Sequence, residues 1–188
     1  MTADSQTSET PEALVARLAE AGRAAQRVLA RLDAPAKAAA LHAAAAALRA
    51  HEDAILAANA RDVAAGEANG LTAALIDRLR LDPARLAGIA DAVDQVADLA
   101  DPVGQVIDSA SRPNGMVLSR VRIPIGLIGI IYESRPNVTA DAAALCVRSG
   151  NAVLLRGGSE AVHSNRAIHA ALAEGLASAG VPAAAVQL

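Results

Sequence analysis

A continuous apolar run from Gly126 to Tyr132 constrains the fold more than any other feature of this sequence. The run has no polar face, which is typical of a parallel strand covered on both sides, because a strand with one side in water alternates apolar and polar residues. After Pro136, the pattern predicts a helix from Val138 or Thr139 through Val147, closed by Gly150. A second short buried strand is expected from Ala152 to Leu155.

The same order of elements continues to the end of the sequence. A second helix is predicted from Ser164 to Ala179, with Gly180 as its C-terminal cap, and a third strand begins to emerge from Ala183 to Leu188. Strand, helix, strand, helix and strand in this order are typical of an open α/β unit with right-handed crossovers. We therefore expect an α/β domain over residues 124–188.

The first hundred residues differ in composition and pattern: they are rich in alanine, and their apolar residues recur at three- and four-residue spacing. Both features favour helices, since alanine loses least on entering a helix. Helices are expected from Pro11 to Leu32, after the break at Asp33-Ala34-Pro35, from Glu52 to Ala68, from Leu71 to Leu79 and from Pro83 to Leu99. Residues 11–100 are interpreted as a scaffolding helical layer, and the polar residues 1–10 as a disordered tail.

Alanine almost vanishes after Asp101, where a hairpin is indicated. Asn114-Gly115 is a hairpin turn signal. Met116 to Ile123 alternates in polarity like a half-exposed strand. Residues 101–123 are therefore predicted to form a hairpin arm.

Composition excludes several classes of partner. Seventeen Lys and Arg against 20 Asp and Glu give a net charge of -3, and the basic residues are scattered, so a nucleic-acid partner is not expected. Tyr132 is the only aromatic residue, which removes stacking platforms and aromatic cages. The longest uncharged apolar run, from Ile123 to Tyr132, is too short to cross a membrane. These features predict a protein that binds neither nucleic acid nor membranes.

A single cysteine, Cys146, lies within a predicted helix and has apolar neighbours. One thiol cannot form an intramolecular disulfide, which suits the cytoplasm, and no set of metal ligands is evident around it. A buried thiol in apolar surroundings is disfavoured as a thiolate. Cys146 is therefore interpreted as structural rather than nucleophilic.

Ligands of open α/β sheets bind beyond the carboxyl ends of the strands, which draws attention to the loops at residues 133–137 and 156–160. In the second loop, Arg156 can pair with phosphate, Gly157 and Gly158 let a ligand approach the backbone, and Ser159 offers a hydroxyl. An anionic or ribose-bearing ligand fits this pattern. The alternative is a surface pair between Arg156 and Glu160 in a glycine turn. Neither a G-x-G-x-x-G after the first strand nor a Walker loop is present.

The first loop carries a candidate oxyanion donor. The Asn137 amide could donate to an oxygen that gains negative charge during a reaction. The alternative is a helix cap, formed by Asn137 or by Thr139.

Long stretches of the sequence resemble the γ-glutamyl phosphate reductase family, also called glutamate-5-semialdehyde dehydrogenases, of the aldehyde dehydrogenase superfamily. The resemblance is carried by residues 123–139 (Ile-Pro-Ile-Gly-Leu-Ile-Gly-Ile-Ile-Tyr-Glu-Ser-Arg-Pro-Asn-Val-Thr) and by residues 141–146, 149–153, 155–161 and 185–188, with further matches at 69–71, 76–79 and 99–104. It covers nearly everything after the polar tail.

The resemblance implies a fold and an activity. The expected fold is an N-terminal helical layer, an oligomerisation hairpin and the first half of an NADP-binding α/β domain. The implied reaction is the NADPH-dependent reduction of L-glutamyl 5-phosphate to L-glutamate 5-semialdehyde and phosphate, the second step from glutamate to proline. Members of the family are well over twice as long, and their nucleophilic cysteine lies in the part beyond this sequence. The sequence is therefore interpreted as an N-terminal fragment, inactive alone, of a homo-oligomeric enzyme.

The resemblance also suggests roles for individual residues. Arg156 falls where many aldehyde dehydrogenases place a lysine on the adenine ribose, and a neutral Ser159 beside it favours NADPH, although Glu160 follows directly. Asn137 lies close to the superfamily's oxyanion amide, and Arg135 could anchor phosphate or the substrate carboxylate. Two alternatives remain open: a noncatalytic remnant that forms oligomers, and a related reductase of another acyl phosphate.

Overall fold

The computed structural model describes residues 9–188. The tail predicted for residues 1–10 lies almost entirely outside the described residues. Thr10 is the N-cap of the first helix, where its side-chain oxygen accepts a hydrogen bond from the Ala13 N–H at 3.2 Å.

A parallel sheet and the helices that connect its strands occupy the described chain from Leu127 onward, with strand order β3-β4-β5. The strands are β3 (Leu127–Ile131), β4 (Ala152–Arg156) and β5 (Val186–Gln187), and they are joined by α6 (Asn137–Arg148) and α7 (Val162–Ser178). This arrangement confirms the predicted α/β unit. The last strand is shorter than predicted, because Ala183–Ala185 forms a 3-10 turn instead.

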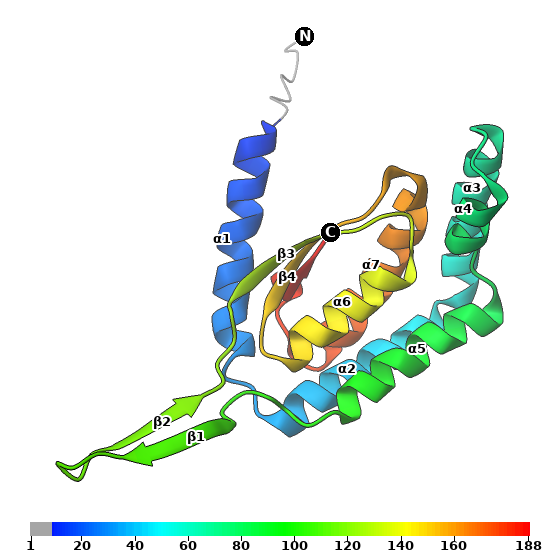
Figure 1. The fold of residues 1–188 in the computed structure, drawn as a ribbon. Coiled ribbons are helices and arrows are strands. Elements are labelled where there is room, and N and C mark those ends of the chain that lie inside the picture. The colour runs from blue at the N-terminus through cyan, green and yellow to red at the C-terminus, as the bar shows by residue number, and fades with distance from the viewer. Residues whose placement is uncertain (1–8) are drawn as a thin grey trace.

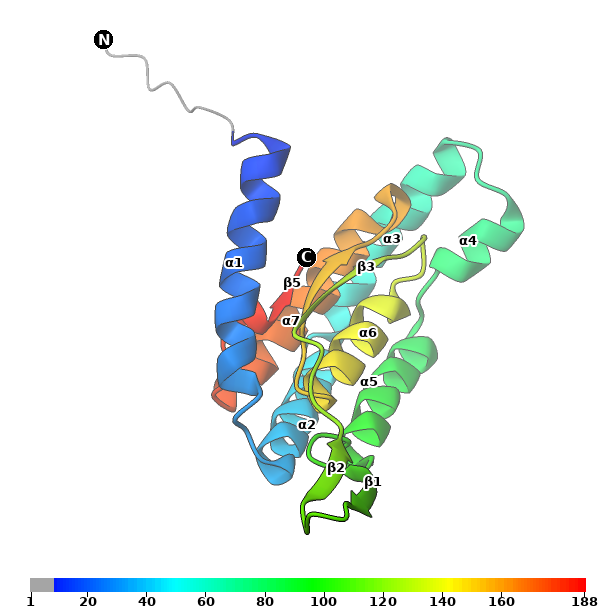
Figure 2. The same cartoon turned by 60° about the vertical axis from the view of Figure 1, so that its left-hand side comes forward.

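Helices cover this sheet in layers (Figures 1 and 2). The helices α6 and α7 pack on one face of the sheet, and α1 (Pro11–Leu29) on the other. Three further helices pack outside α6 and α7: α2 (Ala34–Ala50), α3 (Glu52–Ala68) and α5 (Pro83–Asp98). The short α4 (Ala73–Leu79) packs against α3. No helix within residues 9–188 is both long and apolar enough to cross a membrane.

The alanine-rich helices approach one another closely, as their small side chains allow. A Cβ atom added at Gly175 in α7 would lie 2.5 Å from the Ala43 carbonyl oxygen in α2. Leu41, Leu48 and Leu172 are buried in the core between these layers. The predicted scaffolding layer is therefore confirmed as helical.

The prediction that β3 is covered on both sides is wrong. Ile128 and Ile130 pack against the core, but Gly129 is exposed and Ile131 has an exposed fraction of 80%. On that open face, α1 covers only the beginning of the strand, where Gly22 packs against the Leu127 side chain. The end of β3 therefore leaves apolar surface open.

The hairpin between the helical layer and the sheet is confirmed. It consists of β1 (Val106–Ser111) and β2 (Val117–Val121), paired antiparallel, and projects away from the rest of the chain (Figure 1). Gly115 adopts a positive φ of 82° at the predicted turn. One strand was expected to be half-exposed, yet both strands are exposed along their whole length, because nothing in the described chain packs on either face of the hairpin.

A buried arginine joins the ends of three helices. Arg148, at the end of α6, is 8% exposed. Its guanidinium donates hydrogen bonds to the carbonyl oxygen of Leu99, at 2.9 Å from Nε, and to that of Ala34, at 2.8 Å from Nη1. These bonds join the end of α6 to the end of α5 and the start of α2.

Candidate functional site

The two loops singled out from the sequence lie side by side at the carboxyl ends of β3 and β4. The Tyr132 N–H donates to the Arg156 carbonyl oxygen at 3.0 Å. The Ser134 hydroxyl donates to Glu160 Oε2 at 2.6 Å, which joins the first loop to the start of the 3-10 turn Ser159–Ala161. The parallel register of the strands therefore brings the two loops together, as expected.

The two glycines of the second loop have neighbours within the chain. A Cβ atom at Gly157 would lie 2.2 Å from Asn165 Nδ2 and 3.0 Å from the Tyr132 ring. A Cβ atom at Gly158 would lie 2.8 Å from Glu160 Oε2 and 2.9 Å from Ser134 Oγ. A side chain at either glycine would force these neighbours to move, so both glycines allow close packing within the chain at this place.

A cleft of about 490 Å³ lies over these loops, and Arg156, Gly158 and Ser159 line it. The alternative ion pair between Arg156 and Glu160 is absent from the described part of the chain. Glu160 is held by Ser134 instead, and that hydrogen bond is the largest cause that lowers its pKa. The guanidinium of Arg156 is exposed at the rim of this cleft.

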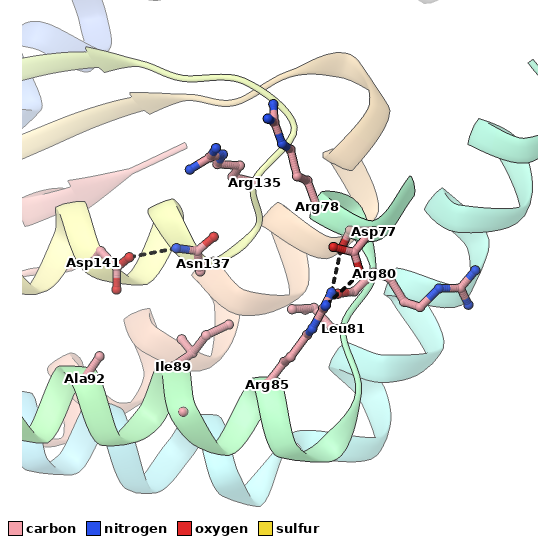
Figure 3. A pocket seen from close by; sticks show the side chains of 11 residues that line it. Asp77, Arg78, Arg80, Leu81, Arg85, Ile89, Ala92, Arg135, Asn137 and Asp141 are labelled. Atoms are coloured by element: carbon pink, nitrogen blue, oxygen red, sulfur yellow. Dashed lines mark hydrogen bonds and ion pairs between the residues drawn. The ribbon is translucent and has the colours of Figure 1, made fainter. Parts of the chain in front are cut away.

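Asn137 and Arg135 line a second cleft, also of about 490 Å³ (Figure 3). Asn137 Nδ2 donates to Asp141 Oδ2 at 2.9 Å, one turn further along α6. Burial raises the pKa of the Asp141 carboxyl, and the Asn137 hydrogen bond opposes that shift. An amide nitrogen carries two hydrogens, so one hydrogen of Asn137 remains for another acceptor.

Both cap alternatives for this loop are wrong. Pro136 occupies the N-cap position of α6, where no side chain caps the helix. Thr139 is buried, and its hydroxyl bonds to the Tyr132 hydroxyl at 2.7 Å and to Asn165 Oδ1 at 3.1 Å. Thr139 therefore ties α6 to β3 and α7 rather than capping its own helix.

Two buried polar residues of α3, missed by the sequence reasoning, bind the start of α7, which follows the second loop. Asp62 is 3% exposed and accepts hydrogen bonds from the N–H groups of His163 at 3.2 Å and Ser164 at 2.7 Å. Asn59 donates to Ser164 Oγ at 3.0 Å and to the Leu79 carbonyl oxygen at 2.8 Å. A carboxylate of the chain therefore occupies the N-terminus of α7. The available signal was two polar residues three positions apart on the apolar face of a helix.

Cys146 is buried, with an exposed fraction of 5%, on the inner side of α6. Burial raises the pKa of its thiol to about 11. The interpretation of this thiol as structural is consistent with both findings.

The architecture defines a class of protein. The chain superposes on a NAD-dependent benzaldehyde dehydrogenase from Corynebacterium glutamicum with a TM-score of 0.69 at 22% identity, over 92% of this chain and 34% of that one. The helical layer, hairpin and parallel sheet therefore form the first half of an aldehyde dehydrogenase-type fold. No protein-family model matches the chain.

More similar proteins narrow the class to one family. The γ-glutamyl phosphate reductase of Novosphingobium aromaticivorans is 73% identical over 175 residues, which are 93% of this chain and 41% of that protein. The crystal structure of the Thermotoga maritima γ-glutamyl phosphate reductase matches with a TM-score of 0.89 at 42% identity, over 92% of this chain and 42% of that one. The chain is similar to γ-glutamyl phosphate reductases over more than nine tenths of its own length and spans less than half the length of these relatives.

Proposed function

We propose that the protein containing this sequence reduces L-glutamyl 5-phosphate with NADPH to L-glutamate 5-semialdehyde and phosphate, the second step of proline biosynthesis from glutamate. The observation that carries the proposal is the 73% identity to a protein named γ-glutamyl phosphate reductase. The two clefts beyond the parallel strands support it, because ligands of such sheets bind there.

In this proposal, Arg156, Gly157, Gly158 and Ser159 bind the cofactor. When bound, NADPH supplies a hydride to the substrate. The residues present fit a dinucleotide carrying a 2'-phosphate, because the exposed Arg156 guanidinium and the Ser159 hydroxyl line one cleft. Glu160 is the nearest acidic side chain along the chain, and its carboxylate is bound by Ser134 across the cleft.

Two residues of the other loop bind the substrate in this proposal. The free hydrogen of the Asn137 amide donates to the carbonyl oxygen as it gains negative charge. Arg135 lines both clefts and has no ion-pair partner within residues 9–188, which leaves its guanidinium for an anionic group of the substrate. Cys146 takes no part, since its thiol is buried and its pKa is raised.

The test is the reaction itself, together with Arg156→Ala in the protein expressed from its own gene. We expect Arg156→Ala to lower kcat/KM for NADPH by about 10- to 100-fold and to change kcat/KM for NADH little, because only NADPH carries the 2'-phosphate. The matched control is Arg61→Ala, which removes an exposed arginine of α3 that lines neither cleft.

Two results would count against the proposal. A wild-type protein that does not reduce glutamyl phosphate would refute the activity. Equal losses for the two cofactors in Arg156→Ala would refute the assignment of Arg156 and leave the activity intact.

The hairpin is proposed to join copies of the protein into a homo-oligomer. Its exposed apolar side chains support this role, because an isolated hairpin with apolar residues on both faces is poorly stable in water. They are Val106, Ile107, Met116, Val117, Leu118 and Val121. We expect Leu118→Asp to lower the sedimenting mass. An unchanged mass would argue against an interface at the hairpin.

A further inference from the structure

Arg78 and Arg135 are the two residues that line both clefts. Arg78 lies on α4 and Arg135 in the loop after β3, so they reach this place from different parts of the fold (Figure 3). One cleft contains Arg156 and Ser159, and the other contains Asn137. The two guanidinium groups therefore stand where the proposed cofactor cleft meets the proposed substrate cleft.

Two acidic side chains of this region, Asp77 and Glu67, form ion pairs with arginines other than Arg78. Asp77 Oδ1 lies 2.7 Å from Arg85 Nη2, and Glu67 Oε1 lies 3.0 Å from Arg80 Nη2. Within residues 9–188, neither Arg78 nor Arg135 has an ion pair or a side-chain hydrogen bond.

Besides Asp77, three acidic side chains line the clefts near the two arginines. Asp141 accepts a hydrogen bond from Asn137, and Glu160 accepts one from Ser134. Glu133 lines the cofactor cleft and is exposed. The two arginines therefore present positive charge that the chain itself does not use.

The backbone of Arg78 is held in place from several sides. Ile76 and Leu79 are buried on the opposite side of α4, in a cluster with Val63. The Leu79 carbonyl oxygen accepts the Asn59 hydrogen bond, and the Arg80 carbonyl oxygen accepts one from Arg85 Nη1 at 2.9 Å. These contacts fix the helix from which the Arg78 side chain extends.

We propose that Arg78 and Arg135 together bind the phosphoryl group of the acyl phosphate substrate, an inference that rests on the proposed function. A guanidinium donates two parallel N–H groups to two phosphate oxygens, and two neighbouring guanidinium groups suit a dianion better than a single carboxylate. Their position between the clefts would place the phosphoryl group beside the carbonyl carbon that receives the hydride.

The balance of the reaction gives this pair a role. The cysteine thiolate that the resemblance places beyond this sequence adds to the carbonyl carbon, the bond from that carbon to the phosphate oxygen breaks, and phosphate leaves with the bonding electrons and takes up a proton from solution. The thioester then gains a hydride from NADPH, and its carbon–sulfur bond breaks to release the aldehyde and the thiolate. Negative charge therefore develops on the leaving phosphate, and two guanidinium groups beside it would stabilise that charge.

The reverse reaction tests the assignment, because inorganic phosphate is then a separate substrate. In the protein expressed from its own gene, we expect Arg78→Ala to raise the KM for phosphate about tenfold and to leave the KM for the aldehyde within about twofold. Arg78→Lys keeps the charge but loses the fork of donors, so an intermediate KM is expected. Arg61→Ala is the control for the loss of one exposed positive charge, and thermal melting checks that each variant is folded.

A titration of the protein with inorganic phosphate, followed by phosphorus NMR, separates this proposal from the proposed function. Weaker phosphate binding in Arg78→Ala than in wild type and Arg61→Ala would support the site even if the reductase assay failed. Unchanged phosphate binding in an active enzyme would overturn the inference alone. A rise in the KM for the aldehyde in place of the KM for phosphate would also overturn it, and would assign the pair to the substrate carboxylate.

Discussion

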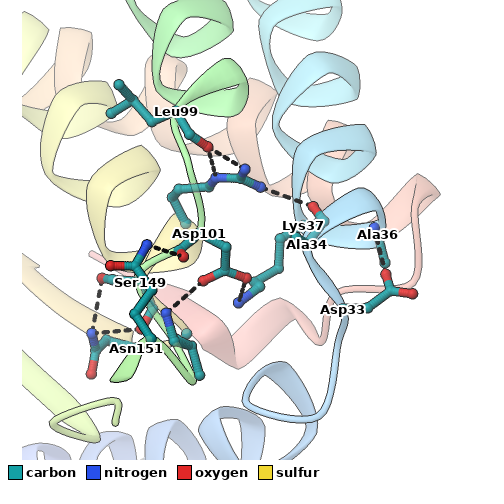
Figure 4. Close-up of polar contacts among 12 residues, drawn as sticks. Asp33, Ala34, Ala36, Lys37, Leu99, Asp101, Ser149 and Asn151 are labelled. Atoms are coloured by element: carbon teal, nitrogen blue, oxygen red, sulfur yellow. Dashed lines mark hydrogen bonds and ion pairs between the residues drawn. The ribbon is translucent and has the colours of Figure 1, made fainter. Parts of the chain in front are cut away.

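The Lys37 ammonium lies 2.5 Å from Asp101 Oδ2 at the junction between the helical layer and the hairpin (Figure 4). Lys37 is the only lysine in the sequence, and its side chain is 1% exposed. Asp101 also accepts a hydrogen bond from the Val103 N–H at 2.9 Å. This buried ion pair therefore joins the start of α2 to the segment that leads into β1.

Removing the lysine should destabilise the protein strongly. Lys37→Met leaves the Asp101 carboxylate without its partner in a nearly buried place, and we expect a loss of about 3 kcal/mol in the free energy of unfolding. The double variant Lys37→Met/Asp101→Asn also removes the unpaired Asp101 charge and should recover part of the lost free energy of unfolding. Urea denaturation measures both. A single variant as stable as wild type would show that the pair contributes little.

The same pair predicts loss of stability in acid. Burial alone raises the pKa of Asp101, but the Lys37 hydrogen bond, the Val103 N–H and the charges of Lys37 and Arg148 together hold that pKa below its ordinary value. A lowered folded-state pKa gives stability that is fully present above the unfolded value of about 3.9 and is lost as the pH falls through the folded pKa. Unfolding measured below about pH 4 should show this loss in wild type and a smaller one in Asp101→Asn.

His42 on α2 predicts a change of stability in the opposite direction. Its Nδ1 lies 2.7 Å from Asp94 Oδ1 on α5, and that hydrogen bond is the largest cause that raises the His42 pKa. A raised pKa gives stability that is present below the unfolded value of about 6.5 and is lost as the pH rises through the folded pKa.

The expected contribution of His42 is under about 1 kcal/mol, because the imidazole is partly exposed and solvent screens the pair. Thermal melting between pH 6 and 9 should show a decline in wild type that His42→Ala lacks. Parallel curves for the two proteins would contradict the prediction.

The helices and the hairpin turn could be predicted because their signals are local. Thr10 caps the first helix, the Asn69-Gly70 pair ends the third, and Gly115 takes the positive φ that the turn requires. The exposure of β3 could not be predicted in the same way. Whether Ile131 is covered depends on where α1 lies, and α1 is far upstream in the sequence.

The candidate site, like the fold, could be predicted only where its signals are local. The two loops could be located because parallel strands place their carboxyl ends at one edge of the sheet. The partners of α7, which follows the second loop, could not be located from the sequence. The hydrogen bond from the Ser164 N–H to Asp62 joins residues 102 positions apart. Arg78 lies in a motif that the family resemblance singled out, yet its place beside Arg135 follows only from the packing of α4.

Gly157→Ala should disturb the packing of the two loops. The added methyl group would lie 2.2 Å from Nδ2 of the buried Asn165 and 3.0 Å from the ring of the half-buried Tyr132, so at least one of these neighbours must move. We expect a loss of about 1 to 3 kcal/mol in the free energy of unfolding. Gly129→Ala is the matched control, since a methyl group there meets nothing within 4 Å. Equal stability of the two variants would show that the loop adapts freely.

Asp62→Asn should weaken both the fold and the cofactor loop. The Asp62 carboxylate accepts the N–H groups of His163 and Ser164 and also the Ser164 hydroxyl, at 2.6 Å. An amide has a single acceptor oxygen and no charge for the positive end of the α7 dipole. We expect a loss of about 2 kcal/mol in the free energy of unfolding.

Because α7 directly follows the loop with Arg156, the KM for NADPH should also rise in Asp62→Asn, with a smaller change in kcat. Glu20→Gln is the matched control, since it removes one exposed negative charge from α1, away from both clefts. Urea denaturation and steady-state kinetics on the same preparations separate the two effects. If stability falls while the KM for NADPH stays at the wild-type value, Asp62 supports the helix alone, and the position of the loop does not depend on it.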